Sequence, residues 1–337
     1  MEHMEMSKEE FAGYVKSHIL EYLPQSYSGS NIVLSSTLKN NGTLKNAIIV
    51  AKPGEKVSPC IYLDPYYNML SDVATEDIMN FIAKSRVENE VNCRNIEEKS
   101  PELFDHRLLE WDTVKDRILP RVVNTERNQE YLSEHPSREK VDLSMHYRLL
   151  VSTDNGGTST IGVTYDLMEH WGVTEEELFH AAQVNEHNIF PTMVKPIGDM
   201  IKGFGAELPA ECQGMPTKYD MYVMTNSVNQ NGATVLFTDE PFAKLAEYIN
   251  TDLYILPSSI HEVIAISTEG WWKPEDLAMM VRDVNSSEVS PEEQLSDHVY
   301  FYDKDQHELR IADECHNQKQ TADMENDNTT YHRRGGR

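Results

Sequence analysis

Hydrophobic positions recur along this chain at two spacings, one typical of helices and one typical of strands. Spacings of three and four residues predict amphipathic helices. We place the clearest of these at residues 7–23, 65–72, 75–90, 165–170, 174–188, 239–249 and 274–285. Alternating or continuous apolar runs predict strands, many of them joined as hairpins. We place these at residues 32–51, 60–63, 118–124, 141–164, 219–225, 233–237, 253–266 and 299–311.

The order of these elements predicts the fold class. Strands come in hairpins and are followed by helices, whereas an α/β protein would alternate single strands with helices. The chain is therefore predicted to have an α+β fold, with two lobes of antiparallel hairpins packed with helices.

A break in the periodicity suggests how the chain divides. Residues 92–107 are charged and irregular, and we interpret them as an exposed linker. This linker separates an N-terminal α+β lobe, residues 7–91, from a C-terminal α+β lobe, residues 108–311. Residues 1–6 form an extension. Residues 312–337 are polar and lack periodicity, which predicts a disordered tail.

Charge narrows the range of partners. The 337 residues include 56 acidic and 30 basic side chains, a formal net charge of −26. Such a charge repels nucleic acid and anionic membranes, so direct binding to either is not expected. Another protein remains a partner that this charge allows, and the oligomeric state stays open. No apolar segment approaches the roughly 18 residues that would span a bilayer.

Cysteine spacing and the N-terminus suggest a compartment. The four cysteines lie far apart and form no C-x-x-C pair, so reduced thiols fit better than a disulfide framework. The first residues, MEHMEMSKEEF, contain no apolar stretch of the kind found in signal peptides. We therefore expect a cytoplasmic protein. Neither G-x-x-x-x-G-K-[ST] nor G-x-G-x-x-G occurs, and no cofactor is predicted.

A polar bend between two apolar runs is the first candidate site. In LYILPSSIHEVIAI, residues 253–266, Ser259 and His261 are two residues apart, which places them on one face of an extended segment. Asp297 would complete a hydroxyl–imidazole–carboxylate set. However, the G-x-S-x-G elbow is absent, and neighbouring side chains on one strand point the same way. We therefore favour a structural role, in which the hydroxyls of the bend hydrogen-bond loop amides.

The helix at residues 174–188 contains the second candidate site. Glu177 and His180 form an E-x-x-H pair, and His187 lies two turns further along the same face. Dimetal bundles use two such pairs, and this chain has one. The H-E-x-x-H pattern of zinc proteases is also absent. Exposed polar positions on a helix explain these residues better, and no metal is predicted.

Four phrases resemble a known family. They are VVNTERN at residues 122–128, WGVTEEEL at 171–178, DLYILPSSIHEV at 252–263 and LSDHVY at 295–300. They are similar to an uncharacterised domain-of-unknown-function family of Gram-positive gut anaerobes, whose members often look like cargo of mobile elements. The resemblance covers residues 7–311. It implies a bacterial, cytoplasmic protein and carries no catalytic residues.

Three functions compete at this point. The absence of enzyme motifs favours a non-enzymatic interaction or accessory protein of a mobile element. The first alternative is a hydrolase that uses Ser259, His261 and Asp297. The second is an anti-defence protein whose acidic surface mimics DNA, which requires carboxylates arrayed at the spacing of phosphates.

Overall fold

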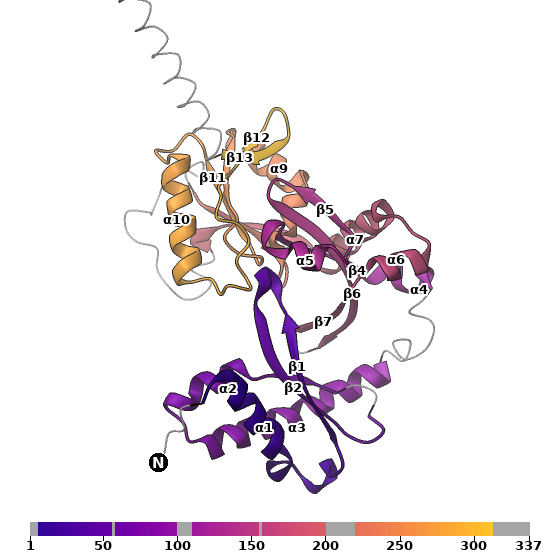
Figure 1. The fold of residues 1–337 in the computed structure, drawn as a ribbon. Coiled ribbons are helices and arrows are strands. Elements are labelled where there is room, and N and C mark those ends of the chain that lie inside the picture. Colours follow the sequence, from indigo (N-terminus) through magenta and orange to yellow (C-terminus); the bar gives the residue numbers. More distant parts are fainter. Residues whose placement is uncertain (1–5, 56–57, 100–109, 155–156, 200–219, 313–337) are drawn as a thin grey trace, which may run out of the picture. The chain divides into compact units, whose positions relative to one another are not determined.

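A computed structural model describes residues 6–55, 58–99, 110–154, 157–199 and 220–312 (Figure 1). The fold is α+β with antiparallel sheets, as the sequence predicts. The chain forms two compact units. One comprises Met1–Val114 and Leu150–Ile161, and the other comprises Lys115–Leu149 and Gly162–Arg337. Within the described residues, no helix is both long enough and apolar enough to cross a membrane.

The first unit is built around the antiparallel hairpin β1–β2 and the helices α1 and α3. Its elements are α1 (Lys8–Tyr22), η1 (Gln25–Tyr27), β1 (Asn31–Leu38), η2 (Asn40–Gly42), β2 (Leu44–Ala51), β3 (Cys60–Tyr62), α2 (Asp64–Asn68), η3 (Met69–Ser71), α3 (Thr75–Lys99) and α4 (Trp111–Val114). The sheet order is β1-β2-β3. The apolar stripes of α1 and α3 pack with β2 into one core that includes Phe11, Ile19, Ile48 and Ile78.

The predicted first hairpin is confirmed. β1 pairs with β2 in register from Asn31 opposite Ala51 to Leu38 opposite Leu44. Asn41 and Gly42 in the turn have positive φ values of 58° and 70°. Asparagine and glycine adopt this backbone conformation at little cost, which is why they recur in tight hairpin turns.

Helix α3 is longer than its predicted end at residue 90. It continues to Lys99, so residues 92–99 of the expected linker are helical. These residues include arginine, glutamate and lysine, which are good helix formers, and the first proline is Pro101. Residues 100–107 lie outside the described residues, as do residues 1–5 of the extension and residues 313–337 of the tail.

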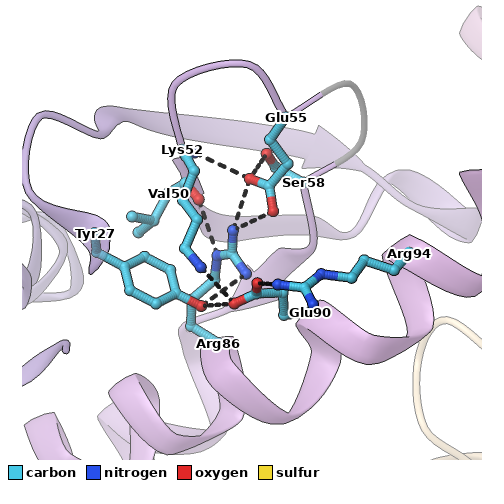
Figure 2. Close-up of polar contacts among 8 residues, drawn as sticks. All are labelled: Tyr27, Val50, Lys52, Glu55, Ser58, Arg86, Glu90 and Arg94. Atoms are coloured by element: carbon cyan, nitrogen blue, oxygen red, sulfur yellow. Dashed lines mark hydrogen bonds and ion pairs between the residues drawn. The ribbon is translucent and has the colours of Figure 1, made fainter. Parts of the chain in front are cut away.

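A buried ionic network joins α3 to the loop after β2 (Figure 2). The guanidinium of Arg86, which is 0% exposed, donates two hydrogen bonds to the Glu55 carboxylate, at 2.8 and 2.7 Å. Tyr27 and Lys52 both donate to Oε2 of Glu90, at 2.6 and 2.7 Å. These bonds satisfy charges that would be costly to bury alone, so the network fixes the position of α3.

The second unit contains two antiparallel sheets. Its elements are η6 (Lys115–Arg117), β4 (Ile118–Asn124), η7 (Glu126–Asn128), α5 (Gln129–Leu132), β5 (Ser137–Lys140), β6 (Leu143–Asp154), α6 (Tyr165–Trp171), α7 (Glu175–Ile189), β8 (Thr192–Pro196), β9 (Tyr222–Asn226), η10 (Gly232–Phe237), α9 (Glu240–Ile249), β10 (Leu253–Leu256), β11 (Val263–Ser267), α10 (Pro274–Ser287), β12 (Tyr300–Asp303) and β13 (Glu308–Ile311). From Leu150 onward, β6 belongs to the first unit, and β7 (Gly157–Gly162) pairs with β6.

The larger sheet contains the two apolar strands predicted at residues 253–266. Its order is β13-β12-β10-β11-β9-β8. β10 and β11 are adjacent and antiparallel, as predicted, with Leu253 opposite Ser267. Helix α10 lies beside this sheet (Figure 1). Its residues Leu277 and Val281 pack with Leu256 and Ile266. The smaller sheet has the order β4-β6-β5.

Some predicted elements differ from the structure. Residues 233–237, expected as a strand, lie in the 3-10 helix η10, in which all six residues are buried. A continuous apolar run marks burial and does not by itself distinguish a strand from a tight helix. Strands β5 and β8 were not predicted, because SREK and TMVKP are polar or contain proline. Residues 200–219, expected as a loop from 203 to 218, lie outside the described residues.

Candidate functional site

The bend between β10 and β11 is tied to a second segment of the chain. Ser259 forms an antiparallel bridge with Gln294. The carbonyl of Ser258 accepts a hydrogen bond from the amide of Leu295 at 3.1 Å, and that of Pro257 accepts one from Ser296 at 3.0 Å. The ILPSSIHEV and LSDHVY phrases therefore lie side by side, although nearly forty residues separate them along the chain.

The three candidate triad residues bind different groups. Oγ of Ser259, which is 6% exposed, accepts a hydrogen bond from the His261 amide at 3.0 Å. Nδ1 of His261 accepts one from the amide of Asn231 at 3.2 Å, and its Nε2 lies 3.3 Å from Oε1 of Glu293. Because Nδ1 accepts, the neutral imidazole carries its proton on Nε2, and this N–H donates a hydrogen bond to Glu293.

Asp297, the third member of that set, accepts hydrogen bonds from Arg127 and from Nδ2 of Asn285. Over the described ranges, no hydrogen bond joins the side chains of Ser259, His261 and Asp297 to one another. The contacts support the structural interpretation of the bend, in which its hydroxyl tethers backbone.

The bend also holds the 3-10 helix η10. The carbonyl of His261 accepts hydrogen bonds from the Gly232 amide and from Oγ1 of Thr225, both at 2.9 Å. A Cβ on Gly232 would lie 2.7 Å from that carbonyl oxygen and 2.5 Å from Thr225 Oγ1. Only glycine permits so close an approach, so this residue couples η10 to the bend.

Helix η10 in turn holds a carboxyl group on α7. Oγ1 of Thr234 donates a hydrogen bond to Oε1 of Glu186 at 2.5 Å. The neighbouring Asn185 fixes α7, because its Nδ2 donates to the carbonyls of Lys115 and Ile118 at 2.7 and 2.9 Å. Glu186 is thus positioned from two sides.

Glu186 lines a cavity of about 810 Å³, which we call the α7–α9 groove. The groove lies among α7, β8, β9, the end of η10 and α9. Its lining includes Val184, Glu186 and His187 of α7, Val194 of β8, and Leu245 and Tyr248 of α9. A volume of this size falls in the range of ligand sites, and a mostly apolar lining with a few polar groups is typical of them.

Burial perturbs the ionisable groups around the groove. It raises the pKa of Glu186 to about 7, against the opposing effects of the Thr234 hydrogen bond and the nearby charge of Arg121. Burial also lowers the pKa of Arg121 to about 10. At another part of the lining, burial together with Asp220 and Tyr248 raises the pKa of Tyr222 to about 12. A carboxyl with a pKa near neutrality in a cavity is a recognised mark of a functional site.

The metal candidates on α7 separate into two groups. His180 and His187 both line the groove. Glu177 lies at the start of the helix, where its carboxylate accepts the Thr174 amide at 2.8 Å in a capping box. The described part of the chain contains no cluster of three or more His, Cys, Asp or Glu residues suited to a metal ion.

A second, polar pocket of about 370 Å³ lies where VVNTERN meets LSDHVY, and we call it the Asp142 pocket. Asp142 accepts hydrogen bonds from Tyr300 at 2.5 Å, Ser296 at 2.7 Å and Asn124 at 3.3 Å. Val141, in its lining, has a positive φ of 53°, a conformation that is strained for a β-branched residue.

A family comparison covers both the groove and the pocket. The sequence model described as a family of unknown function (DUF5688) matches residues 8–304. The chain belongs to this family. The predicted resemblance to a family of unknown function is thus confirmed. The four phrases that suggested it and its gut-anaerobe and mobile-element context stay predictions. No curated protein and no solved structure matches this DUF5688 chain.

Sequence analysis of this DUF5688 member missed Glu186 and its partner Thr234. A signal for Glu186 was available, because Leu178, Ala182 and Glu186 follow one another at intervals of four residues. A glutamate on the buried stripe of an amphipathic helix needs a compensating contact. Thr234 gave no signal of its own, since it lies inside an apolar run.

Proposed function

We propose that this DUF5688 protein is a non-enzymatic interaction protein that binds an extended, partly apolar segment of a partner protein in the α7–α9 groove. The observation that carries this proposal is that apolar side chains lining the α7–α9 groove are exposed to solvent. Val184 is 48% exposed, Val194 37% and Tyr248 70%. Such side chains gain from burial, and tyrosine is enriched among the residues that dominate binding energy at interfaces.

The charge of the chain supports a basic partner. A net charge of −26 attracts cationic proteins over long distances and speeds their association. A cytoplasmic location and an accessory role in a mobile element, as the family resemblance implies, form part of this proposal. The hydrolase and the DNA mimic remain alternatives from the sequence.

Selection from a random peptide library on phage tests the proposal. The full-length protein would be the bait, and the double variant Val184→Ser plus Tyr248→Ser would serve for counter-selection. Both substitutions are on exposed, neutral side chains, so they should leave the fold and the charge unchanged. We expect enrichment of peptides that bind the wild-type protein and lose at least about tenfold in affinity for the double variant.

Two outcomes would contradict the proposal. One is a selection that enriches no peptide, and the other is a set of peptides that bind the wild type and the double variant equally. A matched control, Tyr165→Ser, changes a tyrosine of α6 that is 45% exposed and does not line the groove. This variant should retain all selected peptides.

A further inference from the structure

We propose that the segment bound in the α7–α9 groove presents a cationic group, the ammonium of a lysine or the guanidinium of an arginine, to the carboxylate of Glu186. This inference rests on the proposed function, because it names the chemistry of the ligand for the same groove.

The hydrogen bonds of Glu186 leave one carboxylate oxygen available. Oε1 accepts the bond from Thr234, whereas Oε2 has no hydrogen-bond partner within the described ranges. Arg121, whose charge acts on Glu186, donates from Nη1 to the carbonyl of Pro120 at 2.7 Å and is not part of the described groove lining. A ligand in the groove can therefore donate a hydrogen bond to this oxygen without displacing a donor of the protein.

The carboxylates of the Asp142 pocket provide a contrast. Asp142 accepts three hydrogen bonds from the protein, and Asp297 accepts from both Arg127 and Asn285. Their charges are already compensated by donors of the chain itself. Glu186 differs because one neutral hydroxyl is its hydrogen-bond donor, and a partly buried carboxyl with one such donor gains most from a cation.

The surroundings of the groove are acidic. Lys244 pairs with Glu240 at 2.5 Å, so these two charges of the lining offset each other. Burial raises the pKa of Asp220, and the charge of Asp199 adds to this effect. Burial likewise raises the pKa of Tyr222 in the lining, and the charge of Asp220 adds to it. The other titratable groups of the described lining are the imidazoles of His180 and His187 and the phenol of Tyr248.

These features also explain the pKa of Glu186 near neutrality. Without a ligand, burial favours the protonated form of this carboxyl. A cation in contact with Oε2 favours the ionised form and forms a charge-assisted hydrogen bond in a partly water-excluded site. Apolar side chains of the groove would contact the apolar part of the bound segment, and Glu186 would select its cationic group.

Two small probes with the same tail and different heads separate these contributions. The probes are n-octylammonium and 1-octanol, titrated by calorimetry at pH 7.5 into the full-length protein. We expect n-octylammonium to bind about tenfold more tightly than 1-octanol, the magnitude of one charge-assisted hydrogen bond. In Glu186→Gln this preference should fall to within about twofold, while 1-octanol binds as before.

A matched variant controls for charge alone. Glu247→Gln removes one negative charge from an exposed position of α9 that does not line the groove. Its preference for n-octylammonium should equal that of the wild type. Since glutamine can still accept the Thr234 bond, Glu186→Gln should keep its fold, and the comparison of the two probes on the wild type needs no variant at all.

The outcomes distinguish the inference from the proposed function. Equal affinity of both probes, unaffected by Glu186→Gln, overturns the inference and leaves the groove as an apolar binding site. Failure of both probes to bind overturns the inference and the proposed function together. So does a dimer in sedimentation velocity that Val184→Ser plus Tyr248→Ser dissociates, because the groove would then be covered by a second copy of this chain.

Discussion

Replacing Arg86 by methionine should loosen the first unit strongly. Arg86 is 0% exposed and donates to three groups from different elements. Its Nε donates to the Val50 carbonyl at 2.9 Å and its Nη1 to the Tyr27 hydroxyl at 3.3 Å. Its Nη2 donates to both oxygens of Glu55 (Figure 2). Methionine keeps most of the aliphatic stem and removes all of these donors.

The magnitude follows from what the substitution leaves behind. Removing one partner of a buried ion pair typically costs about 3–5 kcal/mol, because the other charge stays buried without compensation. Glu55 keeps the Ser58 hydroxyl, at 2.7 Å, and the Lys52 amide, at 3.0 Å, which places the loss at about 3 kcal/mol, toward the lower end of that range. Arg94→Met is the matched control, since Arg94 lies on the same helix and donates to Glu90 of the same network, but its side chain is 68% exposed. An exposed ion pair is worth less than about 1 kcal/mol.

Hydrogen exchange of peptides from β2 and from the first four turns of α3 measures how far each variant destabilises the structure around the network. We expect amide protection in Arg86→Met to fall by at least about a hundredfold and in Arg94→Met by less than about fivefold. If the two variants lost similar protection, burial would not decide the strength of the network, and the reasoning would be refuted.

Three other substitutions test separate parts of the chain. Hydrogen bonds from Lys52 and Tyr27 lower the pKa of Glu90 from 4.5 to about 2. The ionised Glu90 therefore stabilises the folded state fully above about pH 4.5, and this stabilisation is lost as the pH falls toward 2. In urea titrations, Glu90→Gln should lower the free energy of unfolding by about 1–2 kcal/mol at pH 7, a figure that allows for solvent screening, and by clearly less at pH 3. An equal loss at both pH values would contradict this. Gly232→Ala should lower the free energy of unfolding by about 1–3 kcal/mol through its backbone clashes, and a neutral effect would show that η10 can shift freely. Gly13→Ala, in the interior of α1, should raise the free energy of unfolding by about 0.5–1 kcal/mol, because the added Cβ meets nothing within 4 Å beyond its chain neighbours and its own helix backbone. A lower midpoint in thermal denaturation would contradict this.

Local patterns were sufficient to predict much of the fold. The pairing of β10 with β11 was predictable because two β-branched runs flank a proline and two serines. The helix start at Ser7 was predictable because Glu10 completes a capping box, which the structure contains. In each case the residues that determine the structure lie within a few positions of one another.

The groove was not predictable because the contacts that form it are distant in sequence. Thr234 and Glu186 are 48 residues apart, and the Gly232 amide bonds a carbonyl at His261. Periodicity identifies which face of a helix is buried but not which loop covers it. The spacing of Ser259 and His261 was informative only for an extended strand, and both residues lie in the bend between β10 and β11.

The bend links both cavities, which affects how substitutions in ILPSSIHEV should be interpreted. Toward the α7–α9 groove, the His261 carbonyl accepts a hydrogen bond from η10, and Thr234 of η10 donates one to Glu186. Toward the Asp142 pocket, the Pro257 carbonyl accepts a hydrogen bond from the Ser296 amide, and the Ser296 hydroxyl donates one to Asp142. Loss of function in Ser259→Ala would therefore not identify a nucleophile, because the same hydroxyl accepts the His261 amide. Binding of n-octylammonium separates the two roles. A nucleophile can be removed without weakening this binding, whereas loss of the tether should displace η10 and weaken it severalfold.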